Sequence, residues 1–234
     1  MRISKFISFI FALAILSSST NLSAKCSQPS DEDVWAQLQA GNKRYVHNKE
    51  FARQRAKVAN GQNPPCVVLS CSDSRVTPEY VFDQAIGRLF VARTAGQVVD
   101  DVVVDSIEFA VGEWDVFSIV VLGHTNCGAV VGALGRLRKN HGVIDQQNGH
   151  LNAVLIPIEK AIVQAGINIY GPNALEKSIR ANIAYSANQL IEQSPAIAKA
   201  VEKGRVNIIG AEYSLKTGKV KQLFVIDSTT SSSS

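Results

Sequence analysis

Two short polar segments, each following a largely apolar run, most constrain how this chain can fold. Cys71-Ser72-Asp73-Ser74-Arg75 follows residues 66–69, and His124-Thr125-Asn126-Cys127-Gly128 follows residues 117–122. Apolar runs of this length are typical of buried strands. In an open α/β sheet, chemistry gathers beyond the carboxyl ends of the strands. The sequence therefore predicts that two neighbouring strands bring Cys71, His124 and Cys127 to one point.

These three side chains form a suitable set of metal ligands. Two thiolates and an imidazole bind Zn²⁺ well, and three protein ligands leave a fourth position open, as in catalytic zinc sites. Asp73 and Arg75 lie next to the first ligand in sequence, where polar groups that orient a metal site are expected. A bidentate contact with Arg75 would hold the Asp73 carboxylate off the metal. Alternatively, Asp73 is itself a fourth ligand and closes the site.

Each half of this pattern also has an ordinary explanation. A cysteine that closes a buried strand is usually a small hydrophobic residue, and a lone His-x-x-Cys arises by chance. Asp73 and Arg75 could be a structural ion pair at a strand end, because such pairs are common. The occurrence of both segments, each after a predicted strand, favours a shared metal site.

The N-terminus has the layout of a secretory signal peptide. Arg2 and Lys5 precede the apolar residues 6–16, and small residues follow up to Ala24. We expect residues 1–24 to be cleaved and the protein to be exported, to the periplasm or, where the source has no outer membrane, to the medium. A membrane anchor is the alternative, but the apolar run is short for crossing a bilayer.

Composition sets limits on domains and partners. Loss of Arg2 and Lys5 with the signal peptide lowers the formal net charge from +4 to about +2, too weak a balance to indicate a nucleic-acid partner or an anionic membrane. We expect one zinc-dependent catalytic domain over residues 25–227 and a disordered polar tail over residues 228–234. Cys26 and Cys66 either pair in a disulfide or remain free thiols. Their spacing in the sequence does not decide between these states, because it does not show whether the two side chains lie within bonding distance.

The remaining patterns predict an α/β fold with alternating strands and helices. Such an order is typical of a mostly parallel central sheet flanked by helices, here with a hairpin at the C-terminal edge. The predicted strands cover residues 66–69, 89–92, 117–122, 206–213 and 220–226, and the predicted helices cover residues 30–45, 100–111, 127–137, 151–163 and 173–191.

Cys-x-Asp-x-Arg followed by His-x-x-Cys-Gly resembles the signature of the β-class carbonic anhydrases. Residues 90–96, residues 106–111 and the C-terminal hairpin also look like family segments, in the family's order. The resemblance implies one Zn²⁺ per chain, bound by Cys71, His124 and Cys127. It implies reversible hydration of carbon dioxide to bicarbonate and a proton by attack of zinc-bound hydroxide, with Asp73 and Arg75 as the orienting catalytic dyad.

The resemblance also implies a substrate pocket and an assembly. The assembly would be a homodimer or a dimer of dimers with active sites at the subunit interface, acting on a small molecule. From the sequence itself we expect no stable membrane anchor, because no second long apolar span follows the signal peptide. In this chain phenylalanine stands at position 109, where a tyrosine is common in the family. The residues implied for the substrate pocket are Gln62, Phe90, Ala95, Gly96, Phe109 and Gly128.

Other functions compete with this interpretation. Hydrolysis of carbonyl sulfide or carbon disulfide could use the same scaffold, and pocket access would decide between the substrates. A non-catalytic zinc protein closed by Asp73 is less consistent with Arg75, because a structural site needs no clamp on that carboxylate. A cytosine-deaminase-type site is excluded, because the chain lacks the His-x-Glu and Pro-Cys-x-x-Cys patterns.

Overall fold

The computed structural model describes residues 31–146 and 150–229, which divide into two units at His47. In the first unit, α1 (Asp31–His47) begins with acidic residues and ends with Arg44 and His47, as the helix dipole favours. The second unit begins at Asn48. The predicted signal peptide, Cys26 and the tail residues 230–234 lie outside the described residues, whereas residues 228 and 229 form a turn.

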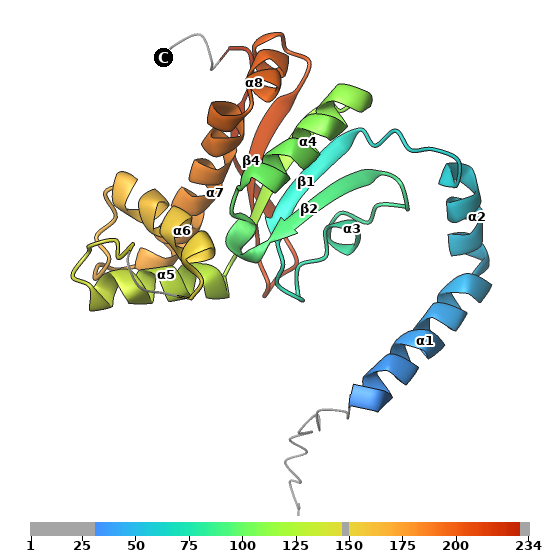
Figure 1. The fold of residues 1–234 in the computed structure, drawn as a ribbon, viewed down its shortest axis with the longest axis horizontal. Coiled ribbons are helices and arrows are strands. Elements are labelled where there is room, and N and C mark those ends of the chain that lie inside the picture. Colours follow the sequence, from blue (N-terminus) through green and yellow to red (C-terminus); the bar gives the residue numbers. More distant parts are fainter. Residues whose placement is uncertain (1–30, 147–149, 230–234) are drawn as a thin grey trace, which may run out of the picture. The chain divides into compact units, whose positions relative to one another are not determined.

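A five-stranded sheet forms the centre of the second unit, with the strand order β2-β1-β3-β4-β5 (Figure 1). The first four strands in sequence run parallel, and β5 runs antiparallel to β4. This confirms the predicted mostly parallel sheet with a C-terminal edge hairpin. The strands are β1 (Cys66–Cys71), β2 (Leu89–Thr94), β3 (Ser118–His124), β4 (Asn207–Tyr213) and β5 (Val220–Ile226).

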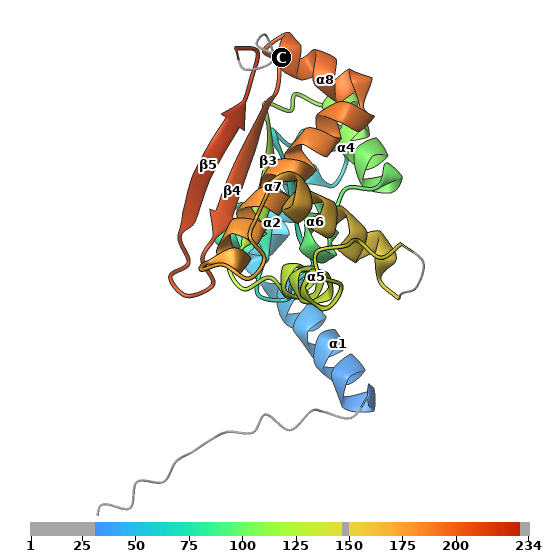
Figure 2. The ribbon, with the colours of Figure 1, turned by 90° about the vertical axis from the view of Figure 1, so that its left-hand side faces the viewer.

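One face of the sheet packs against a layer of helices (Figure 2). Alternate residues of the central strands, among them Leu69, Ile119 and Ile208, are fully buried in one core with the apolar sides of these helices. This alternation follows from the two-residue period of a strand. Helices α4 (Asp101–Glu113) and α7 (Ala174–Gln193) contact the strands, and α8 (Pro195–Glu202) packs against both of them. Helices α5 (Gly128–Lys139) and α6 (Asn152–Gln164) pack against α7 and share the same apolar core.

The opposite face of the sheet carries a smaller apolar cluster. Val68 and Leu122 lie at its centre, and Val81 and Phe82, at the end of the short helix α3 (Pro78–Val81), pack against it. Helix α2 (Lys49–Val58) precedes β1 in the chain. Its Gln54 side chain accepts a hydrogen bond from the backbone N–H of Ile86, in the segment between α3 and β2. Within the described residues, no helix is both long and apolar enough to cross a membrane.

Helix α7 packs tightly against the sheet at Gly123, the residue before His124. A Cβ atom at this position would lie 2.5 Å from Cγ1 of Ile183, so only glycine lets the helix pack here. Because β1 and β3 are parallel and Ser70 pairs with Leu122, Cys71 and His124 both lie at the same edge of the sheet. The fold therefore places α7 directly behind the predicted metal ligands.

Candidate metal centre

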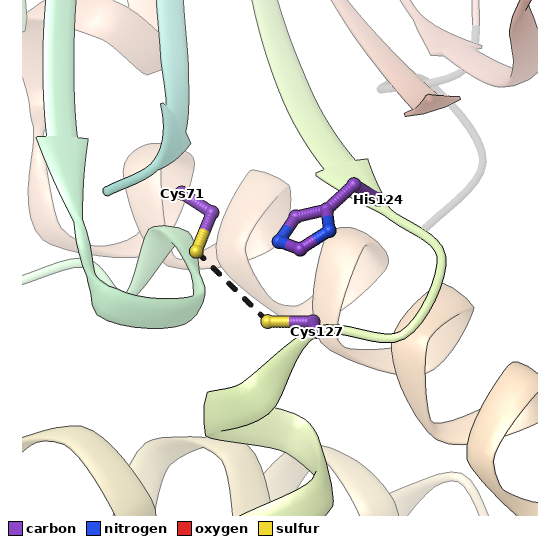
Figure 3. A group of neighbouring side chains, drawn as sticks. All are labelled: Cys71, His124 and Cys127. Atoms are coloured by element: carbon purple, nitrogen blue, oxygen red, sulfur yellow. Dashed lines mark hydrogen bonds between the residues drawn. The ribbon is translucent and has the colours of Figure 1, made fainter. Parts of the chain in front are cut away.

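The three predicted ligands converge at the carboxyl edge of the sheet, that is, where the parallel strands have their carboxyl ends (Figure 3). Cys71 ends β1, His124 ends β3, and Cys127 is the residue before the first turn of α5. Their ligand atoms all lie within 4.8 Å of one another, and all three side chains are buried. The structure thus forms a compact Cys-His-Cys group by bringing Cys71 to the His124–Cys127 segment, which lies more than fifty positions further along the chain.

The orientation of the group suits a metal ion. Nδ1 of His124 lies 2.9 Å from the carbonyl oxygen of Thr125, and because a carbonyl only accepts, Nδ1 must donate. In the neutral imidazole, Nε2 therefore carries the lone pair that a metal ion would use. Nε2 is buried and has no hydrogen-bond partner among the described residues. The two sulfurs are 3.9 Å apart, close to the ~3.8 Å that two zinc–sulfur bonds at a tetrahedral angle require.

The electrostatics of the group also favour a cation. The Cys127 thiol, by donating to Cys71, lowers the pKa of Cys71 to about 4 despite burial. The same contact, together with burial, raises the pKa of Cys127. Burial opposes a charge on His124, but the neighbouring Cys71 sulfur and the Thr125 carbonyl raise its pKa. The protonation states of the three groups therefore depend on one another. A bound metal cation would take the place of the protons that the ligand atoms now share.

Asp73 and Arg75 form a bidentate ion pair beside this group. The guanidinium donates to both carboxylate oxygens, at 2.9 Å to Oδ1 and 2.7 Å to Oδ2, and the Arg75 backbone N–H donates to Oδ1 at 3.0 Å. These contacts lower the pKa of Asp73 and keep it ionised. Oδ2 lies 3.8 Å from Nε2 of His124, so an ionised carboxylate stands at the edge of the candidate metal site.

Arg93, to which the sequence analysis assigned no role, holds the loop that carries Cys71 and Asp73. Its side chain donates to the backbone carbonyls of Cys71 at 3.1 Å, Asp73 at 2.8 Å and Val76 at 2.6 Å. One guanidinium thereby binds three carbonyls along the loop that follows β1. The sequence offered one signal for this role: Arg93 is a charged residue directly after the apolar run 89–92, at a position that still belongs to β2.

A short 3₁₀ turn, η1 (Ala95–Gln97), lies on the other side of Cys71. The backbone N–H of Gly96 donates to the Cys71 sulfur at 3.3 Å. The backbone N–H groups of Ala129 and Val130, at the start of α5, interact with the Cys127 sulfur and favour its thiolate. Backbone donors therefore face both sulfurs, as they should where thiolates are needed.

Comparison with known proteins identifies the family. Residues 66–220 match the family model described as carbonic anhydrase. The chain is 35% identical over 191 residues to carbonic anhydrase 2 of Mycobacterium tuberculosis, covering 80% of this chain and 89% of that protein. The chain belongs to the β-carbonic anhydrase family. It is a carbonic anhydrase, and the predicted resemblance is confirmed.

Further relatives agree with this assignment. The carbonic anhydrase of Pseudomonas aeruginosa is 34% identical over 178 residues, which are 71% of this chain and 76% of that protein. The β-carbonic anhydrase CafA of Aspergillus fumigatus superposes with a TM-score of 0.66 at 25% identity, over 82% of this chain and 89% of that one. A tetrameric β-carbonic anhydrase of Sordaria macrospora shares the fold, with a TM-score of 0.69 at 22% identity, over 82% and 97%.

The residues predicted to line the substrate pocket of this carbonic anhydrase fall into two groups. Ala95, Gly96 and Gly128 lie at the carboxyl edge, beside the Cys-His-Cys group. Gln62 lies at the opposite edge, because it precedes the first residue of β1, whereas Cys71 is the last. Its neighbour Asn63 forms two hydrogen bonds with Asp115, which lies just before β3, so this segment is held at the amino ends of the strands.

Phe90 and Phe109 belong with Gln62. Phe90 pairs with Val67 while Thr94 pairs with Cys71, so Phe90 is about 13 Å from the metal edge along the strand. The rings of Phe90 and Phe109 both contact Trp114, at centroid distances of 5.5 and 5.4 Å. Phe109 is 56% exposed. A single chain therefore does not bring Gln62, Phe90 and Phe109 to its own Cys-His-Cys group.

Replacing Arg93 by lysine or glutamine should weaken the site without unfolding the sheet. Glutamine has only two N–H donors, and lysine carries its three on a single nitrogen, whereas Arg93 reaches the three carbonyls from two separate nitrogens. The loop that carries Cys71 and Asp73 should therefore loosen, and catalytic efficiency should fall roughly tenfold or more. The measurement is stopped-flow carbon dioxide hydration, with the melting temperature recorded alongside. Arg88→Gln, an exposed arginine just before β2, is the matched control, and equal losses in both variants would contradict a specific role for Arg93.

Proposed function

We propose that this carbonic anhydrase is a zinc enzyme that converts carbon dioxide and water reversibly to bicarbonate and a proton. Cys71, His124 and Cys127 would hold one Zn²⁺ per chain. The observation that carries the proposal is the buried Cys-His-Cys group: Nε2 of His124 has no hydrogen-bond partner in the described part of the chain, while Thr125 fixes the proton on Nδ1. Bound there, zinc would lower the pKa of a water molecule to about 7 and so supply a nucleophile at neutral pH.

The ligands themselves set the charge of the site. Two thiolates balance the charge of a divalent cation, and the imidazole stays neutral because its only free nitrogen is the ligand atom. The N–H of Gly96 stabilises the thiolate of Cys71, and the first turn of α5 does the same for Cys127. A site of zero net charge admits a neutral, weakly polar substrate and releases an anion readily.

Asp73 would orient the attacking water. An ionised carboxylate only accepts hydrogen bonds, so Asp73 would bind the hydrogen of the nucleophile and turn a lone pair toward the carbon of carbon dioxide. Arg75 binds both carboxylate oxygens, which keeps Asp73 charged and engages the two atoms that would otherwise bind the metal. This clamp supports an open catalytic site over one that Asp73 closes as a fourth ligand.

The division of the substrate-pocket residues supports a homodimer. Gln62 precedes β1, on the side of the sheet away from the metal group. Phe90 and Phe109 meet through Trp114, and Phe109 exposes an apolar ring. A second subunit would bring these residues to the metal group of the first, completing two equal sites across a two-fold axis. In α1, the exposed apolar residues Trp35 and Leu38 offer further surface for a partner or a dimer of dimers.

Loss of a thiolate ligand should abolish the activity. Cys127→Ser should lower zinc content below one per chain and reduce carbon dioxide hydration by at least ~100-fold, because removing a ligand costs more than removing a group that only orients one. Stopped-flow hydration from pH 6.5 to 9 and metal analysis test this, and a strong chelator should have the same effect on the wild type. Cys66→Ser, a cysteine outside the group, should retain both.

Two outcomes would count against this function. A fully zinc-loaded wild type without hydration activity would indicate another substrate, and carbonyl sulfide and carbon disulfide would then be assayed. Full activity in Cys127→Ser, or in protein stripped of metal, would exclude the proposed metal site itself.

Mixing two inactive variants should restore activity if the sites are shared between subunits. In a mixed dimer of Gln62→Ala and Cys127→Ser, one site combines an intact metal group with an intact glutamine. After equal amounts are dissociated and reassembled, roughly a quarter of wild-type activity is expected, because half of the dimers carry one intact site of two. Activity equal to the mean of the separate variants would show that each chain completes its own site.

Export rests on the N-terminal pattern, and we propose that residues 1–24 direct the protein out of the cytoplasm. Expression of the full chain in a bacterium with two membranes should release a periplasmic form that begins at Lys25, because the small residues before it suit signal cleavage. N-terminal sequencing of the osmotic-shock fraction tests this. Recovery of uncleaved protein in the membrane fraction would favour an anchor, and in the cytoplasm would exclude export.

A further inference from the structure

The turn η1 shapes one wall of the metal centre but does not hold itself in place. Gly96 at its middle has φ +67°, and the next residue, Gln97, has φ +47°, conformations that cost an ordinary residue energy. Thr94 joins the two ends of the turn by donating from its hydroxyl to the Val98 carbonyl at 2.7 Å. That bond leaves the middle of the turn to be fixed from outside.

Asn182 supplies that external contact. Its side-chain Nδ2 atom, on α7, donates to the carbonyl of Gly96 at 2.8 Å across 86 positions of the chain. Gly96 therefore receives a hydrogen bond at its carbonyl from α7 and gives one from its N–H to the Cys71 sulfur. The two bonds link a core helix to a metal ligand through one glycine.

The surroundings of Asn182 indicate that its side-chain amide is tolerated in the core because of the hydrogen bond to Gly96. Asn182 is 1% exposed, and the flanking Ile179 and Ile183 belong to the apolar core. An amide buried among apolar groups is unfavourable unless it makes hydrogen bonds. Its Oδ1 atom has no partner among the described residues, so the contact to Gly96 is the one bond that the structure shows for this side chain.

We propose that Asn182 is a positioning residue of the metal centre, and this inference rests on the proposed zinc function. By fixing the carbonyl of Gly96, it keeps the neighbouring N–H directed at Cys71. Without the amide, the buried carbonyl would seek another donor, and glycine, with its wide conformational freedom, would let the turn rotate. The Cys71 thiolate would then lose a backbone donor and bind zinc less firmly.

Two substitutions of Asn182 test the inference. Asn182→Leu keeps the size but removes the donor, and Asn182→Ser is too short to reach Gly96 yet can bond within its own helix. Zinc release from the purified holoprotein to a chromogenic chelator should become roughly ten- to a hundredfold faster in both. Cobalt-substituted protein should show a shifted sulfur-to-metal charge-transfer band, a readout that does not depend on catalysis.

Leu190→Ala, also in α7 and fully buried, is the matched control. It should lower the melting temperature while leaving zinc release within about twofold of the wild type, because it shares no partner with Gly96. Equally fast release in Leu190→Ala, or unchanged release and spectra in both Asn182 variants, would overturn the role of Asn182. A wild type that holds no zinc would overturn the proposed function as well, so the two failures are distinguishable.

Discussion

The parallel pairing of β1 with β3 is the constraint on which the candidate site depends. It places the last residues of two strands side by side, so that Cys71 and His124 meet although α3, β2, η1 and α4 separate them in sequence. Gly123 lets α7 pack against the same edge. Any change of register by one residue would turn one ligand to the other face of the sheet, so strand pairing and metal-ligand geometry are fixed together.

The polar groups around the metal position are held mainly by backbone contacts. The Thr125 carbonyl accepts a hydrogen bond from Nδ1 of His124, and the Gly96 N–H donates to the Cys71 sulfur. The Arg93 side chain donates to backbone carbonyls of the loop between Cys71 and Val76. Backbone groups move little once the sheet and helices have formed. The ligands are therefore prepared for a metal by the same hydrogen bonds that complete the fold, which lowers the cost of ordering them on binding.

Much of the fold was predictable because its strands are apolar and are separated by amphipathic helices of ordinary length. The short elements were missed for physical reasons. Helix α2 buries no residue, so it has no apolar stripe to detect, and α8 is only two turns long, marked mainly by its Ser194 cap and Pro195. The ligands could be anticipated because two cysteines and a histidine follow two predicted strands, and together they form a zinc-ligand set. The Asp73–Arg75 pair could be anticipated because it follows the first of these ligands directly. Arg93 and Asn182 act through backbone carbonyls, which no side-chain pattern reveals.

The separation of Gln62, Phe90 and Phe109 from the metal group has a structural cause. Residues before a parallel strand and residues after it must lie at opposite edges of the sheet, so one chain cannot use both in one small site. A loop long enough to return Gln62 to the carboxyl edge is not available, because Asn63 is bonded to Asp115 and β1 begins at Cys66. If these residues do serve carbon dioxide, symmetry between subunits is the economical arrangement, since a single two-fold axis would complete both sites at once.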